Sequence, residues 1–348
     1  PANQNTLGRP VGFAALAGDR RVVLRWSPVL NPELSGYRIS RRVGADTLYR
    51  VIATLLSPEA ATFADNGALN GIDHAYHLSY LFATGGQSPP AEDVATPGPV
   101  VPWVADGGFG RLARLTPDGR HVDEDRTGFV APGAVAVDTV TGDVWMSDGS
   151  GARLWLLKPA TGVLVSIPSP GTPGDLAVDH GGHGVWVGLE TGGEARYHDR
   201  SGALARTIAG LGNPAGLALD ASDGSLWVCE RDANRVRRID PDDVVVSETA
   251  VTTPSRVALD AATGEAWVTS YTTRRVWRLS PGGAIDLTLT ALGGPVGVAG
   301  DARRGQVWIA DLGLDRVVVL RRDGSTAFTV GGLDAPRAVA VDVETGDG

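Results

Sequence analysis

The 348-residue sequence has a single cysteine, Cys229, and a single methionine, Met146. One cysteine excludes an internal disulfide framework and any zinc site built from several cysteines. No apolar run approaches the ~18 residues of a membrane helix, and no signal-peptide pattern stands at the start. Because the chain begins at Pro1, we expect it to be a processed or excised segment.

Positive charge is scarcer than negative charge, and the formal net charge is −9. Residues 1–100 carry eight arginines and eight acidic residues, so the whole net charge falls on the remaining 248 residues. A negatively charged surface repels the phosphate backbone of nucleic acids, which argues against nucleic acid as a partner.

Turn-forming residues are abundant instead, with 47 glycines and 22 prolines spread along the chain. Hydrophobic residues make up 43% of the sequence, which is enough for a globular core. This combination predicts many short strands separated by turns, and the length predicts two domains.

The first hundred residues contain several strand patterns separated by turn residues. Tyr76, Leu78, Tyr80 and Phe82 alternate with period two, as in a half-buried strand, and we expect the tyrosines here to pack in a core. Three further segments are predicted as strands, namely 21–26, 36–42 and 62–67. Short strands at this density favour a β-sandwich.

This segment resembles a fibronectin type III domain over about residues 9–95. The resemblance rests on Trp26 with Pro28, the Gly-Tyr-Arg-Ile strand at 36–39, Phe63-Ala64-Asp65, and Tyr76-His-Leu-Ser-Tyr80 before Gly86. It implies that Trp26 packs between two sheets and that Tyr76 is the corner tyrosine. Such domains usually act as spacers or binding modules.

A repeat of about 41 residues fills the rest of the chain. Six segments of the form Pro-x-x-Val-Ala-Val-Asp, with small variations, end at Asp138, Asp179, Asp220, Asp260, Asp301 and Asp342. Seven residues after each of the first five aspartates stands a tryptophan: Trp145, Trp186, Trp227, Trp267 and Trp308. A period near 40 with several strands per unit predicts a β-propeller.

The two ends of the repeat array complement each other. At the C-terminal end, the repeat places the tryptophan that follows Asp342 at position 349, one residue past the given sequence. At the N-terminal end, Trp103 and residues 111–115 match the second and third strands of a blade, but no first strand precedes them. Residues 337–342 are therefore predicted to complete the blade begun at Trp103 and to close the ring, which removes exposed sheet edges.

The predicted fold is all-β, with a fibronectin type III-like sandwich followed by a closed six-bladed propeller. The predicted boundaries are an N-terminal extension at 1–8, the sandwich at 9–96, a proline-rich linker at 97–101 and the propeller at 102–348. The propeller repeats resemble NHL repeats, most closely at Ile309-Ala-Asp311 with Asp315-Arg-Val317 and at Cys229-Glu230 with Asn234-Arg-Val236. The resemblance implies fold and not activity, because NHL-like propellers include enzymes, binding proteins and scaffolds.

Most repeated polar residues have a structural interpretation. The aspartate at the end of each first strand is expected to accept N–H groups of the following turn. An acid three residues after the tryptophan and an arginine eight residues after it predict a pair in four blades; the third blade, with Leu189 and Glu194, departs from this rule. His180 and His183, next to Asp179, have metal-ligand spacing but lack a third ligand, so we predict no metal site.

The loops expected at the propeller mouth offer one set of candidate ligand-binding residues: Asp175, Glu190, Arg231, Arg256, Tyr271 and Arg337. None is histidine, and we predict no catalytic residue and no cofactor. The sequence therefore favours a non-enzymatic protein-interaction or structural module that binds a protein partner or self-assembles, such as a subunit of a surface assembly or filament. The alternative is a metal-dependent lyase or lactonase with its site at the mouth.

An extracellular or cell-surface location is implied by the resemblance to bacterial fibronectin-like modules. Residues 1–8 have nothing local to pack against, so we expect a neighbouring subunit to hold them in a head-to-tail contact.

Overall fold

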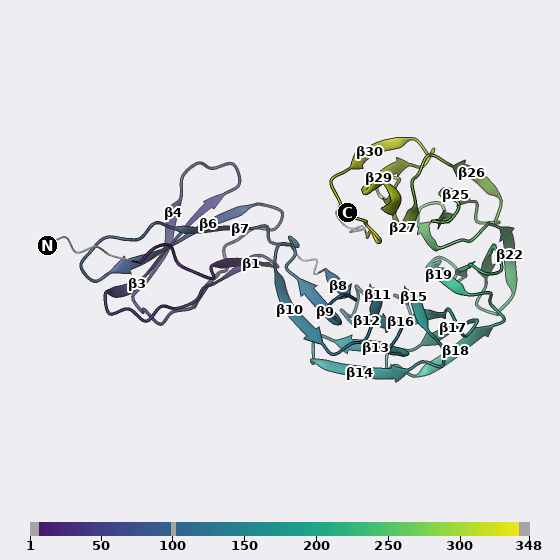
Figure 1. Ribbon diagram of the computed structural model, residues 1–348, viewed down its shortest axis with the longest axis horizontal. Coiled ribbons are helices and arrows are strands. Elements are labelled where there is room, and N and C mark those ends of the chain that lie inside the picture. Colours follow the sequence, from purple (N-terminus) through teal and green to yellow (C-terminus); the bar gives the residue numbers. More distant parts are fainter. Residues whose placement is uncertain (1–6, 99–101, 341–348) are drawn as a thin grey trace. The chain divides into compact units, whose positions relative to one another are not determined.

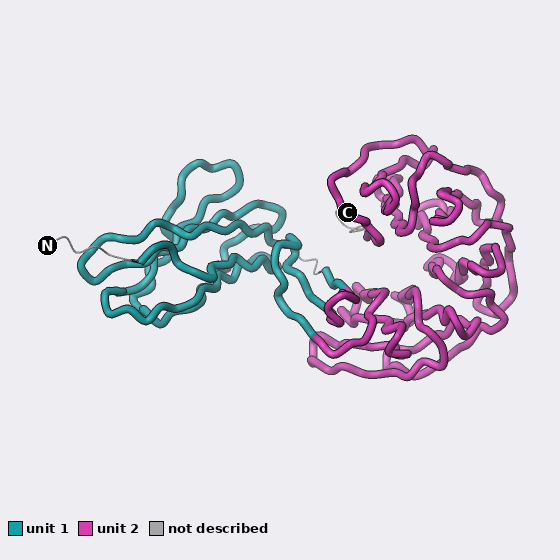
Figure 2. The backbone as a smooth tube through the Cα atoms, in the orientation of Figure 1, with its two compact units in different colours: residues 1–104, 112–126 teal, residues 105–111, 127–348 magenta. Residues whose placement is uncertain are grey.

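The computed structural model describes residues 7–98 and 102–340. The chain divides into two compact units, Pro1–Val104 with Leu112–Arg126, and Ala105–Arg111 with Thr127–Gly348 (Figure 2). The first unit thus includes a segment that follows the start of the repeats. No helix in the described part of the chain has the length and apolar character needed to cross a membrane.

The first unit contains a sandwich of two antiparallel sheets. One sheet has the order β1-β2-β5, with β1 at Ala14–Gly18, β2 at Arg21–Arg25 and β5 at Thr62–Asp65. The other has the order β4-β3-β6-β7, with β3 at Leu34–Val43, β4 at Arg50–Leu55, β6 at His74–Phe82 and β7 at Ala91–Ala95. The alternation seen at 76–82 lies in β6, as predicted, whereas β1, β4 and β7 carry no comparable pattern.

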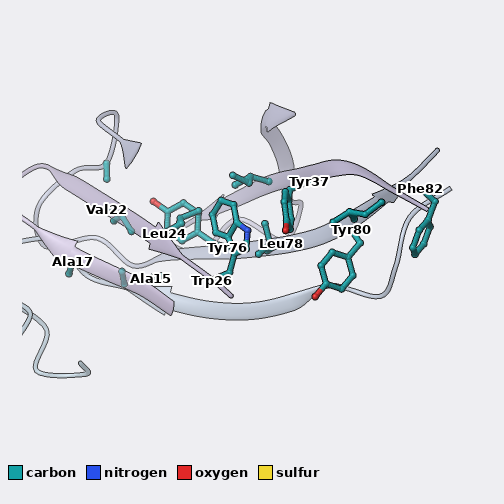
Figure 3. Close-up of a cluster of buried hydrophobic side chains, with 14 residues drawn as sticks. Ala15, Ala17, Val22, Leu24, Trp26, Tyr37, Tyr76, Leu78, Tyr80 and Phe82 are labelled. Carbon is teal, nitrogen blue, oxygen red and sulfur yellow. The ribbon is translucent and has the colours of Figure 1, made fainter. Parts of the chain in front are cut away.

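Aromatic side chains fill the space between these sheets (Figure 3). The Trp26 ring lies 5.1 Å from that of Tyr37, which lies 5.8 Å from that of Tyr80. All three are at most 4% exposed, so the predicted core role of these residues is confirmed. The Tyr76 hydroxyl donates to the Asp65 carboxylate over 2.8 Å, which links the start of β6 to the end of β5.

From residue 103 to residue 340, the described chain forms one three-stranded sheet and five four-stranded sheets (Figure 1). The three-stranded sheet contains β8 (Trp103–Asp106), β9 (Arg111–Leu115) and β10 (Val122–Thr127). The next two sheets contain β11 (Pro132–Val137), β12 (Val144–Asp148), β13 (Arg153–Lys158) and β14 (Val163–Pro168), then β15 (Pro173–Asp179), β16 (Gly184–Leu189), β17 (Glu194–His198) and β18 (Leu204–Ala209).

The last three sheets repeat this arrangement. They contain β19 (Pro214–Leu219), β20 (Leu226–Glu230), β21 (Arg235–Ile239) and β22 (Val245–Ala250), then β23 (Arg256–Asp260), β24 (Glu265–Ser270), β25 (Arg275–Leu279) and β26 (Ile285–Leu289), and finally β27 (Pro295–Asp301), β28 (Gln306–Asp311), β29 (Arg316–Arg321) and β30 (Thr326–Val330). A short 3-10 helix, η1, spans Leu312–Leu314. Successive first strands contact one another, so the sheets follow each other as the blades of a propeller.

The repeated tryptophans pack between blades. Trp145 lies in one cluster with Val185 and Val187 of the next blade, and Trp267 lies with Val307 and Ile309. Burying a large ring at the same place in each blade supplies much of the inter-blade contact.

The end of the propeller shows where closure would occur. No strand pairs with the free edge of β8 among the described residues, and 336–340 form no strand. These residues nevertheless lie beside β27: a Cβ added to Gly297 would be 2.8 Å from the Ala338 Cα, and Val339 packs against the Trp308 cluster. A Cβ at Gly216 meets the Arg256 Cα at 2.7 Å in the same way, so Ala338 takes the position of a first-strand residue. The rest of the predicted strand, 341–342, lies outside the described residues, as do positions 1–6 of the predicted extension and 99–101 of the predicted linker. The expectation that residues 1–8 have nothing local to pack against is wrong for Leu7, which packs against the core of the sandwich.

Candidate functional site

Two kinds of loop meet at one edge of each blade, which corresponds to the predicted mouth. One precedes the first strand of a blade and the other joins its second and third strands. The acid at the end of the second strand ties them together by accepting backbone N–H groups: Asp148 from Val130 and Ala131, Glu230 from Gly212, and Asp311 from Gly293 and Gly294. This role explains why the acid recurs, because otherwise these N–H groups would be left unsatisfied.

The predicted acid–arginine pair forms in three of the four blades that carry both residues. These pairs are Asp106 with Arg111, Glu230 with Arg235, and Asp311 with Arg316, each at 3.0 Å. The prediction is wrong for Arg153, whose side chain donates to the Ser166 hydroxyl instead. Two of the six blades lack the acid, with Leu189 and Ser270 in its place. In the first of these, Leu189 is buried in the core and Thr191 accepts the N–H of Thr172. The hydroxyl oxygen of Thr191, two residues after Leu189, therefore accepts a loop N–H in place of the missing carboxylate.

The strongest grouping of candidate residues spans three blades. The Arg256 Nε lies 3.6 Å from the Asp175 carboxylate, although β15 and β23 are separated by β19. The residue of β19 between them is Gly216, which has no side chain to block the path. Asp175 also accepts the N–H of Leu217 over 2.9 Å, which fixes the carboxylate beside β19.

Gly216 was not among the residues singled out from the sequence. The signal lies in the fourth residue before each repeated aspartate, which is Ala134, Asp175, Gly216, Arg256, Gly297 and Ala338 in turn. Four of these six residues are small, and the two charged ones stand two blades apart with a glycine between. An alignment of the six repeats at this position therefore predicts a single ion pair, between Asp175 and Arg256, among otherwise small residues.

The remaining candidates are less closely grouped. The Arg231 guanidinium lies 3.9 Å from the Glu190 carboxylate, at the limit of an ion pair. Tyr271 is 49% exposed, and its ring lies against Gly294. Arg337 is exposed, in the segment beside β27. The structure thus brings four of the six residues into two acid–arginine pairs.

Cys229 lies beneath this group, on β20 opposite Gly216. Burial raises the pKa of the Cys229 thiol well above its usual range; Asp175 adds to this shift, while Arg256 and Arg231 oppose it. A thiol held in the protonated form is a poor nucleophile, so Cys229 is a packing residue.

The five described aspartates that end first strands have the predicted structural role; the sixth, Asp342, lies outside the described residues. The turn N–H groups that they accept come from Val140 at Asp138, Gly181 and Gly182 at Asp179, Ser222 at Asp220, Ala262 at Asp260, and Arg303 and Arg304 at Asp301. Across residues 7–98 and 102–340, no group of three or more His, Cys, Asp or Glu side chains is placed to hold a metal ion.

The two histidines of the predicted pair both face a carboxylate of the preceding blade. Nδ1 of His183 lies 2.9 Å from the Asp138 carboxylate and Nδ1 of His180 lies 3.3 Å from it. Asp179, their neighbour in sequence, instead accepts the hydroxyl of Tyr197 over 3.0 Å. The side chains therefore fasten one blade to the next.

Asp138 should make the stability of the propeller depend on pH. Burial alone would raise the pKa of Asp138, but hydrogen bonds from Thr141, the Val140 N–H and both histidines lower it to about 2. A lowered folded-state pKa stabilises the fold above the unfolded value near 4, and this stabilisation, about 2 kcal/mol, is lost as the pH falls to about 2.

Urea unfolding of the intact chain and of Asp138→Asn measures this contribution. We expect the variant to be less stable at pH 6 and the difference to shrink steadily between pH 4 and pH 2. A difference that stays constant over this range would contradict the assignment.

No protein-family model matches the sequence, and no curated protein matches it. Solved structures are similar in fold. They include a streptogramin B lyase, at 16% identity and a TM-score of 0.60 over 69% of this chain and 83% of that one. A chain of a nidogen/laminin complex has 17% identity and a TM-score of 0.54, over 69% and 97% of the two chains. A chain of a mitotic checkpoint complex has 13% identity and a TM-score of 0.61, over 70% and 80%. At these identities the similarity shows the β-propeller fold alone.

Proposed function

We propose that this chain is a non-enzymatic extracellular interaction or structural protein whose propeller mouth contacts a protein partner or a second copy. The exposed apolar side chains on the mouth loops carry this proposal. Phe109 is 78% exposed, Val130 66%, Leu314 52% and Tyr271 49%. Aromatic residues and arginine are enriched at protein interfaces, and the candidate mouth residues also include Arg231 and Arg256.

The charges at the mouth support binding more than catalysis. Asp175 and Glu190 each face an arginine, so each acid has a partner in place and neither is held as an unpaired general base. The similar folds include both an enzyme, the streptogramin B lyase, and chains of two protein complexes. Recognition of a protein partner agrees with the similar chains found in protein complexes, and it requires no cofactor.

We infer that the sandwich is a fibronectin type III-like spacer. Its two sheets, with three and four strands, follow the strand order of that class. The Tyr76 hydroxyl holds the corner between β5 and β6 through the carboxylate of Asp65, which is itself paired with Arg41 at 2.7 Å. This differs from the usual corner, in which the hydroxyl bonds to backbone.

We also infer that the propeller is NHL-like and closed by residues 337–342 on β8. The support is the position of Ala338 and Val339 beside β27, where a sixth first strand belongs. Such a strand would cover the free edge of β8, which otherwise invites pairing with other chains.

Paired charge substitutions test the mouth as the contact surface. Phe109→Asp with Tyr271→Asp should weaken self-association, or cross-linking to a secreted partner, by about tenfold or more, because two exposed anchors are lost. The matched control is Val163→Asp with Leu204→Asp, at similarly exposed positions on the fourth strands β14 and β18. Sedimentation and cross-linking, with metal analysis of the same samples, give the readout.

An equal effect of the two double variants would contradict the mouth as the contact surface. A stoichiometric divalent metal held there by three or more side chains would instead favour the lyase or lactonase alternative.

A further inference from the structure

The hairpin of β9 and β10 is attached to the sandwich within the first unit (Figure 2). Nε2 of His121, just before β10, lies 3.0 Å from the Asp93 carboxylate, and the N–H of Thr96 donates to Asp118 over 3.0 Å. Leu16 pairs with Val23 across β1 and β2, on the face turned away from the sandwich core, yet Leu16 is only 8% exposed. The outer face of β1 and β2 is therefore partly covered.

A cavity of about 440 Å³ lies on this face. Its lining includes Arg21, Val23 and Arg25 of β2, together with Asp123 of β10. The three β2 residues alternate with the buried Val22 and Leu24, so they share the outward side of the strand. Arg21 and Arg25 are consequently about 13 Å apart along the strand.

The acidic side chains in the cavity have partners, whereas its two arginines have none among the described residues. Asp123 is paired with Arg114 at 2.5 Å, and Asp19 accepts a hydrogen bond from the Asn70 amide over 2.8 Å. In the part of the chain that the structure describes, Arg21 and Arg25 have neither an ion pair nor a side-chain hydrogen bond. The cavity therefore presents two exposed, unpaired guanidinium groups beside two acids that already have partners.

We propose that this cavity binds an acidic polysaccharide through Arg21 and Arg25. A guanidinium group offers a planar fork of donors that matches a carboxylate or sulfate, and Val23 between the two provides an apolar contact for a sugar ring. A protein strand is a poorer fit, because β2 lies between β1 and β5 and has no free backbone edge to which a peptide could add. This site is separate from the propeller mouth and does not depend on the function proposed for it.

Affinity electrophoresis and titration calorimetry with defined polymers test the proposal. The probes are polygalacturonate for carboxylate, dextran sulfate for sulfate, neutral dextran, and poly-glutamate for an acidic peptide. We expect polygalacturonate or dextran sulfate to bind in a salt-dependent manner, and Arg21→Ala with Arg25→Ala to weaken that binding about tenfold or more. The variant Arg21→Lys with Arg25→Lys keeps both positive charges but loses the planar fork of donors. Its affinity for the polysaccharide should therefore lie between that of the intact chain and that of the alanine variant.

The matched control is Arg9→Ala with Arg50→Ala, which removes the same charge from exposed positions that do not line the cavity. It should bind within about twofold of the intact chain, and melting curves should show that every variant is folded. Equal weakening by both alanine variants, binding of poly-glutamate as tight as that of either polysaccharide, or no binding of either polysaccharide at low salt would overturn the proposal. The mouth variants should leave this binding unchanged, so the two proposals fail independently.

Discussion

Removal of residues 336–348 should lower the melting temperature of the propeller by about 6–12 °C, or leave the protein insoluble. Ala338 and Val339 lie against β27 and the Trp308 cluster, so their loss exposes a buried tryptophan and a first-strand face. Uncovering one such ring and its neighbours costs about 3 kcal/mol, which corresponds to that shift for a domain of this size. Circular dichroism melting of the truncated and intact chains measures it.

The substitution Gly297→Ala tests more directly whether the C-terminal segment lies beside β27. In the intact chain, a Cβ at Gly297 would lie 2.8 Å from the Ala338 Cα and 2.9 Å from the Arg337 carbonyl oxygen, so Gly297→Ala should cost about 1–3 kcal/mol. In the truncated chain the clashing backbone is gone, and the same substitution should cost almost nothing. Gly216→Ala, whose Cβ would meet Arg256, should destabilise both chains and serves as the control. Equal costs of Gly297→Ala in the two chains would mean that the C-terminal segment does not occupy this position.

Substitution of Glu230 by alanine should destabilise the propeller by about 3–5 kcal/mol. The Glu230 carboxylate is fully buried, accepts the Gly212 N–H over 2.7 Å and is paired with Arg235 and Arg237. Burial by itself would raise the pKa of Glu230, but these three donors together lower it. Removing the carboxylate leaves two partly buried guanidinium groups and one loop N–H without their acceptor.

Glu190→Ala is the matched control for this effect. Glu190 occupies the next loop position in the neighbouring blade, but it is partly exposed and 3.9 Å from Arg231, so its loss should cost less than about 1 kcal/mol. Urea unfolding of both variants at neutral pH gives the comparison. A cost for Glu230→Ala as small as that for Glu190→Ala would show that the buried network contributes little.

The series of repeated antiparallel sheets was predictable from the sequence because it depends on local, repeated information. Each blade is built from consecutive strands, so the spacing of the six aspartates and five tryptophans fixes the number of sheets and the packing position of each ring. The strand at 76–82 was equally predictable, since Tyr76, Leu78, Tyr80 and Phe82 alternate in sequence and all lie in the core. Even the turn role of Asp138 and its equivalents follows from chemistry within four residues.

What only the tertiary structure decided involves residues that are distant in sequence. The pairing of Asp175 with Arg256 needs two strands separated by a third, and it exists because Gly216 between them lacks a side chain. His180 and His183 face Asp138 of the neighbouring blade, whereas the adjacent Asp179 accepts the N–H groups of the turn and the Tyr197 hydroxyl. The cavity at Arg21 and Arg25 forms between a strand of the sandwich and a hairpin that the repeat assigns to the propeller. Sequence periodicity describes what a segment does by itself, whereas these contacts depend on which segments the fold places side by side.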